Sequence, residues 1–89
     1  MKTFRWDDKK NQELKQTRGV SFEEILNCKF IGAEKHAKRK NQIVLLFEYK
    51  DYIWMVPSVV EEKYIFLKTL FPSRKYTQKH KKGDKDEKN

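Results

Sequence analysis

Residues 43–71 read IVLLFEYKDYIWMVPSVVEEKYIFLKTLF and hold most of the large apolar side chains of the 89-residue chain. Polar turns at residues 49–51 and 61–63 divide the stretch into three runs rich in β-branched and aromatic residues. Such runs, separated by short polar turns, are typical of consecutive antiparallel strands. Pro57 marks a bulge, a strand end or an edge position, because proline cannot donate to the hydrogen-bond ladder. The stretch therefore predicts a three-stranded antiparallel meander.

Two short helices are predicted ahead of the meander. Asp7 is a favourable N-cap for a polar helix over residues 8–18, and Gly19 supplies its C-terminal stop. Ser21, followed three residues later by Glu24, is the capping-box pattern that starts a second helix. The apolar face of this second helix is formed by Phe22, Ile25 and Leu26.

The remaining segments complete a single α+β domain. Residues 3–6 predict a short edge strand, and residues 30–40, which are rich in charged side chains, predict a basic loop. Residues 83–89 contain no apolar side chain and predict a disordered charged tail. We therefore expect one domain over residues 1–82 with the order β-α-α-β-β-β, built as a small antiparallel sheet with two helices packed on one face.

The charge balance favours an anionic partner. The chain has 21 lysines and arginines against 13 acidic residues, a net charge of +8 and a pI near 9.6. No apolar run is long enough to span a bilayer, and the N-terminus lacks the apolar core of a signal peptide. The single cysteine, Cys28, is expected to be a small core residue rather than a nucleophile, and the composition predicts a reducing, cytoplasmic location.

A basic segment follows the predicted sheet directly. Residues 72–82 read PSRKYTQKHKK and combine five lysines and arginines with a phenol and an imidazole. Cations at the edge of a sheet are suited to bind a phosphate backbone, and titratable groups beside them can transfer protons. The alternative is that residues 72–82 are a frayed, solvated tail without a functional site.

RNA cleavage without a metal needs a base for the 2′-hydroxyl, cations for the transition state and an acid for the leaving oxygen. Arg74 is the best candidate for a bidentate phosphate clamp. Lys75 is a second clamp or an acid or base, and His80 can be either. The candidate catalytic residues are thus Arg74, Lys75 and His80, and the candidate RNA-binding residues are Trp6, Lys10, Lys15, Arg18, Tyr76 and Lys79.

Structural roles compete with each of these assignments. Trp6 and Trp54 are typical core residues, because large aromatic side chains dominate small cores. The alternative for Arg74 and Lys75 is a solubilising end to the domain. His36 lies in a charged segment without a second ligand at suitable spacing, so we expect no metal and no cofactor.

Three blocks of the sequence together resemble one family of bacterial proteins. The blocks are FRWD with Lys10-Asn11 and Leu14, then RGVSFEEI at residues 18–25, then LKTLFPSRKYT at residues 67–77. In this order and spacing they are similar to the BrnT group of toxins. The chain departs from the pattern of many members at Arg5, where they carry Glu, and at Thr17-Arg18-Gly19, where they carry Lys-His-Gly.

The resemblance implies a RelE-like fold and a metal-independent endoribonuclease that arrests translation and growth. It also implies a cognate antitoxin that binds and blocks the toxin, with RNA, on or off the ribosome, as the substrate. Two other functions compete with this one. The chain can be a non-catalytic basic RNA- or ribosome-binding module, or a domain whose basic face binds an acidic protein.

Overall fold

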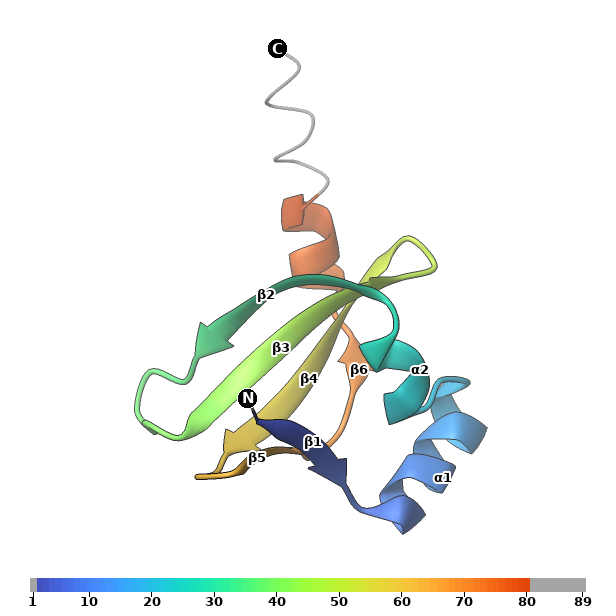
Figure 1. Cartoon of the computed structure of the whole chain (residues 1–89). Helices are drawn as coiled ribbons and strands as arrows, with labels where there is room; N and C mark the ends of the chain where they lie inside the picture. Colours follow the sequence, from blue (N-terminus) through green and yellow to red (C-terminus); the bar gives the residue numbers. More distant parts are fainter. Residues whose placement is uncertain (1, 81–89) are drawn as a thin grey trace.

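The three predicted central strands form the middle of one mixed sheet (Figure 1). The computed structural model describes residues 2–80, so the predicted tail at residues 83–89 lies outside the described residues. A helical segment over residues 74–80 follows the last strand. The other elements are, in order, β1 (Thr3–Trp6), α1 (Asp8–Arg18), α2 (Phe22–Leu26), β2 (Lys29–Lys35), β3 (Gln42–Tyr49), β4 (Tyr52–Val60), β5 (Tyr64–Leu67) and β6 (Phe71–Pro72).

The strand order is β1-β5-β4-β3-β2, with the two-residue β6 paired to β4. Strands β3 and β4 form the longest hairpin, in which Leu45 pairs with Val56 and Phe47 with Trp54. The turn residues Lys50 and Asp51 both have positive φ angles, 51° and 64°. Two left-handed residues in a tight turn match the right-handed twist of the flanking strands. The meander core of the prediction is therefore confirmed.

The purely antiparallel sheet is wrong in one pairing and too small in extent. Strand β1 pairs with β5 in parallel, with Phe4 opposite Ile65. The third predicted strand also ends early, at Leu67, because the chain then turns to place Leu70 fully in the core. Strand β6 resumes the pairing further along β4, with Phe71 opposite Met55.

The predicted basic loop at residues 30–40 is wrong over its first half. Strand β2 covers Lys29–Lys35 and pairs antiparallel with β3, with a register shift between Phe30 and Gly32. It lies at the edge of the sheet, where charged side chains can point to solvent on an exposed strand. Charge alone therefore indicated a loop where the backbone is in fact paired.

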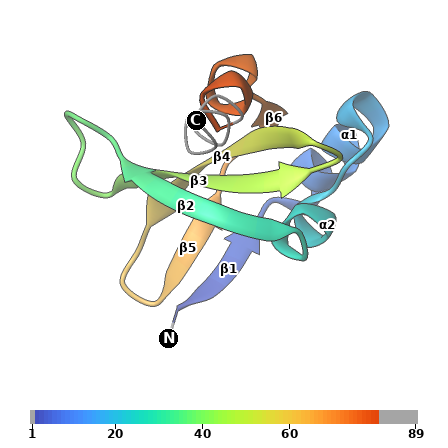
Figure 2. The same cartoon turned by 90° about the horizontal axis from the view of Figure 1, so that it is seen from above.

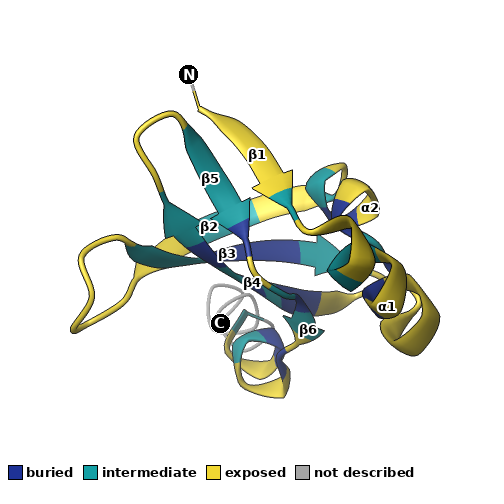
Figure 3. Cartoon of the chain, turned by 90° about the horizontal axis from the view of Figure 1, so that it is seen from below, coloured by how far each residue is buried: buried dark blue, intermediate teal, exposed yellow. Residues whose placement is uncertain are grey.

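Helices α1 and α2 pack on one face of the sheet, as predicted. Side chains alternate along a strand, so Leu45, Phe47 and Trp54 share this face. They form one buried cluster with residues from both helices and from the strands, including Leu14, Val20, Phe22, Ile25, Val56, Leu67 and Leu70. Figure 3 shows this burial concentrated in the central strands and at the inner sides of the helices.

The helical segment over residues 74–80 lies apart from α1 and α2 (Figure 2). Ser73 is its N-cap, because its Oγ accepts a hydrogen bond from the Tyr76 N–H at 3.1 Å. Thr77 is buried and binds Ile53, whose side chain points to the face opposite Trp54. The frayed-tail alternative is thus wrong for residues 74–80, which form a third, docked helical element.

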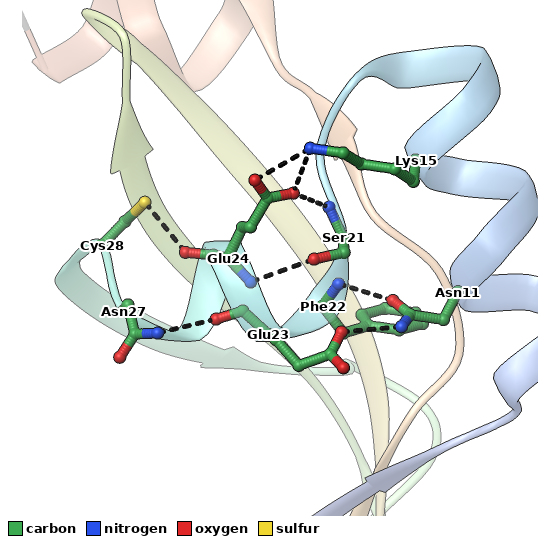
Figure 4. Close-up of polar contacts among 8 residues, drawn as sticks. All are labelled: Asn11, Lys15, Ser21, Phe22, Glu23, Glu24, Asn27 and Cys28. Atoms are coloured by element: carbon green, nitrogen blue, oxygen red, sulfur yellow. Dashed lines mark hydrogen bonds and ion pairs between the residues drawn. The ribbon is translucent and has the colours of Figure 1, made fainter.

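The joint between α1 and α2 is held by caps that the sequence predicted (Figure 4). Ser21 Oγ accepts from the Glu24 N–H at 3.2 Å, while Glu24 Oε1 accepts from the Ser21 N–H at 2.8 Å. Asn11 Oδ1 also accepts from the Phe22 N–H at 2.8 Å. Gly19 ends α1 in the left-handed region, with φ 79°. Within residues 2–80, no helix is both long and apolar enough to cross a bilayer.

Candidate nucleic-acid interface

A cleft of about 520 Å³ opens where the end of α1, the β3–β4 turn and the start of the helical segment meet. Each border has a local cause: the left-handed Gly19 turns the chain after Arg18, and the two left-handed turn residues bring Tyr49 and Tyr52 together. Pro72 pairs with Trp54, which places Arg74 beside the cleft. The lining residues are Arg18, Gly19, Tyr49, Lys50, Tyr52, Trp54, Pro72 and Arg74.

The chemistry of this lining is cationic and aromatic. Three of the lining residues, Arg18, Lys50 and Arg74, are cationic and exposed. Among the described residues that line the cleft, none is a carboxylate or a histidine. Guanidinium and ammonium groups bind phosphate oxygens, and aromatic side chains provide faces on which nucleobases stack. The arrangement is therefore suited to a single-stranded nucleic acid.

Trp54 lines this cleft and is also part of the core. It is 9% exposed and packs edge-on against Tyr49, with ring centroids 5.9 Å apart. Its Nε1 is buried without a hydrogen-bond partner in the part of the chain that the structure describes. The core assignment of Trp54 is confirmed, and the structure adds that one side of the residue borders the cleft.

The structure divides the predicted catalytic residues between two places. Arg74 lines the cleft, whereas His80 lines a second cavity of about 170 Å³, together with Tyr76 and Lys79. Lys75 is exposed on the helical segment between them. Arg74, Lys75 and His80 therefore do not meet in one cavity. Arg18 and Arg74, by contrast, come from distant parts of the sequence to the same cleft.

The second cavity contains an acid–phenol pair. The Tyr76 hydroxyl donates a hydrogen bond to a carboxylate oxygen of Glu34 on β2. This hydrogen bond, with burial and the Glu34 charge as smaller contributions, raises the pKa of the Tyr76 phenol. Tyr76 is consequently held as a neutral donor and links the helical segment to the edge strand.

The remaining predicted RNA-binding residues have other contacts. Trp6 is partly buried against the core and packs on Phe22, with ring centroids 5.7 Å apart, as the core alternative expected. Lys15 Nζ binds both carboxylate oxygens of Glu24, at 2.8 and 2.9 Å, so its charge is locally compensated. Lys10 is partly buried on α1 and does not line the cleft.

Two further polar residues have structural roles. The Cys28 thiol donates to the Glu24 carbonyl at 3.3 Å, and burial, with the Glu24 charge as a smaller cause, raises the pKa of Cys28. A raised pKa opposes a nucleophilic role. His36 Nδ1 accepts from the N–H groups of Lys38 and Arg39 and so shapes the β2–β3 loop. Residues 2–80 contain no cluster of three or more histidine, cysteine or acidic side chains suited to a metal.

Sequence reasoning missed the contribution of the β3–β4 turn to the site. Residues 49–51 were predicted only as a turn, although Lys50 and Asp51 stand between the aromatic residues Tyr49 and Tyr52. That composition was the available signal, because cations bind phosphates and aromatic side chains stack on nucleobases. Comparisons with protein-family models, with curated proteins and with solved structures find no match to this chain.

Proposed function

We propose that this chain is the toxin of a type II toxin–antitoxin system, a metal-independent endoribonuclease of RelE-like fold that acts in the cytoplasm. Three blocks of residues resemble the BrnT toxins, and the net charge of +8 favours an RNA substrate. The observation that carries the proposal is the meeting of Arg18 and Arg74 at one aromatic cleft. Arg74 belongs to a block that carries the resemblance, whereas Arg18 stands where many members of the family carry His.

In this proposal the cleft binds the RNA backbone and stabilises charge. Arg18 and Arg74 hold the phosphate while the 2′-oxygen of the adjacent ribose attacks the phosphorus. They are suited to this role because guanidinium groups stay charged and bind two oxygens at once. The attack breaks the bond to the 5′-oxygen, which leaves protonated, and forms a 2′,3′-cyclic phosphate. The titratable groups that line the cleft are Lys50 and the phenols of Tyr49 and Tyr52. His80, the acid or base proposed from sequence, lines the other cavity.

The antitoxin belongs to the same proposal. A protein that blocks this cleft must compensate the charges of Arg18, Lys50 and Arg74, so we expect it to cover them with acidic residues.

Inducible expression in a bacterial host tests the activity. We expect growth arrest and new 2′,3′-cyclic phosphate ends with the wild-type chain, and loss of both with Arg74→Ala and with Arg18→Ala. Arg39→Ala is the matched control, because Arg39 is an exposed arginine of the β2–β3 loop outside the cleft. Normal growth and intact RNA from folded wild-type protein would contradict the proposal.

A non-catalytic RNA- or ribosome-binding module is the second candidate. The observation in its favour is that no carboxylate or histidine lines the cleft within the described residues. Such a module binds RNA with a steep salt dependence but leaves it uncut. The appearance of cyclic phosphate ends in a reaction with purified protein and RNA separates the two functions.

A further inference from the structure

An apolar groove lies on the α1–α2 face of the sheet, beyond the area that the two helices cover. It has a volume of about 570 Å³ and is lined by Phe4, Leu26, Phe30, Leu45, Phe47 and Ile65. These residues come from β1, β5, β3, β2 and α2, so the groove crosses the sheet from one edge strand towards the other. It lacks the cations of the cleft and shares no lining residue with it.

The alternation of side chains shows which exposed residues share this face. Trp6 and Phe4 point to the same face of β1, and Trp6 is covered by Phe22 of α2. Phe4 lies two residues before Trp6 on the same face of β1 and is 42% exposed. On β2, Phe30 contacts Phe47 at 5.5 Å between ring centroids and is 55% exposed. These are two of the three large hydrophobic residues that are exposed within the described part of the chain.

Two exposed lysines lie at the ends of the two edge strands that line the groove. Lys2 directly precedes β1, the strand that supplies Phe4 to the groove. Lys35 on β2 pairs with Ile43, and Ile43 lies two residues before Leu45, so Lys35 belongs to this face of the sheet. Both lysines are exposed. Lys2 also donates to the Glu61 carbonyl at 2.5 Å, which holds its ammonium group at the β4–β5 turn.

The dimensions of the groove match a short helix. Neighbouring strands lie about 4.8 Å apart, so the four spacings from β1 to β2 span about 19 Å. A helix rises 1.5 Å per residue, and about 13 residues cover that distance. Apolar side chains at i, i+3, i+4 and i+7 of such a helix form the stripe that an apolar groove accepts.

We infer that this groove is the docking site for an acidic amphipathic helix of a partner protein, with its apolar stripe against Phe4 and Phe30 and its carboxylates facing Lys2 and Lys35. A second copy of this chain is disfavoured as the occupant, because each copy carries a net charge of +8 and pairing would bring like charges together. The inference does not depend on ribonuclease activity, since it concerns residues outside the cleft.

A peptide-display selection against the full-length chain tests this inference. The probe is a library of random peptides of about 14 residues, the length that spans the groove. We expect the enriched peptides to combine leucine, isoleucine or methionine at helical spacing with aspartate and glutamate. Their affinity should fall about tenfold in Phe30→Ser, as is typical of an aromatic contact at the centre of an interface.

Matched variants make the outcome specific. Tyr52→Ser removes a comparably exposed aromatic residue, 37% exposed, that lies outside the groove, and should leave peptide binding unchanged. Lys2→Glu with Lys35→Glu should weaken binding, whereas Lys9→Glu with Lys68→Glu, two exposed lysines elsewhere, should not do so to the same extent. Thermal unfolding of each variant confirms that it is folded.

Three results would overturn the inference. One is a selection that enriches no peptide, and another is a set of peptides that bind Phe30→Ser as well as wild type. The third is concentration-dependent dimerisation of the wild-type chain that Phe30→Ser abolishes, which would assign the groove to a second copy.

Discussion

The hydroxyl of Thr77 accepts a hydrogen bond from the backbone N–H of Ile53 at 2.8 Å and donates one to the Ser73 carbonyl at 2.6 Å. The Ile53 carbonyl in turn accepts from the Ser73 N–H at 2.8 Å. One residue of β4 thus has both its backbone groups satisfied by the helical segment and its N-cap. This contact fixes the element on which Arg74 is placed.

Thr77→Val should destabilise the chain by about 1–3 kcal/mol, because it leaves the buried Ile53 N–H without an acceptor while changing the side-chain volume little. Gln78→Ala, at an exposed position of the same helical segment, is the control and should have a much smaller effect. Urea unfolding measures both. Equal stability of Thr77→Val and wild type would mean that water satisfies the Ile53 N–H.

The ion pair between Lys15 and Glu24 should make stability depend on acid pH. The hydrogen bond from Lys15, followed by that from the Ser21 N–H, lowers the pKa of Glu24 from 4.5 to about 2. A carboxyl with a lowered pKa stabilises the folded state above its unfolded pKa and loses that contribution as the pH falls through the folded value. The contribution of Glu24 is therefore complete above about pH 4.5 and disappears towards pH 2.

Glu24→Gln should accordingly be less stable than wild type at neutral pH and nearly as stable near pH 2, where Glu24 is itself half protonated. Denaturant unfolding at a series of pH values measures the difference. Lys68→Met, which removes an exposed lysine with no bond to Glu24, should show no such convergence. A constant difference across the acid range would contradict the role of the ion pair.

Gly19→Ala should destabilise the chain by about 1 kcal/mol, since a side chain at φ 79° is strained in the left-handed region. An added Cβ would meet no atom within 4 Å, so backbone strain is the only cause. Gly32→Ala is a matched control, because it also meets nothing within 4 Å but has no left-handed φ. Thermal unfolding compares the two, and an equal effect at both glycines would refute the explanation.

Arg18→Ala and Arg74→Ala should each weaken RNA binding and flatten its salt dependence. Removing one phosphate contact to a single strand reduces the slope of log K against log salt by about 0.7. A 2′-O-methyl RNA oligonucleotide, which cannot be cleaved by this route, allows binding to be measured by anisotropy across salt concentrations. Arg39→Ala should keep the wild-type slope, and equal slopes in all four proteins would remove the cleft from the RNA interface.

Local signals determined much of this chain by themselves. The sequence predicted three helix ends: the N-cap at Asp7, the capping box at Ser21 and Glu24, and the stop at Gly19. Each of these signals depends only on residues three or four positions away. The β3–β4 hairpin was readable for the same reason, since its turn joins neighbouring strands. The net charge and the candidate Arg74 also followed from the sequence alone.

The tertiary structure decided what depends on distant residues. The parallel pairing of β1 with β5 and the docking of residues 74–80 on Ile53 require partners far along the chain. The strand at residues 29–35 pairs with the neighbouring β3, but its charged sequence gave no sign of that pairing. The charges of β2 and of the helical segment obscured these pairings, because a polar edge strand and a polar loop have similar compositions. In the folded chain Arg18 and Arg74 line one cleft, whereas His80 lines a second cavity. Packing of the elements, rather than spacing in the sequence, determines which of these side chains are neighbours.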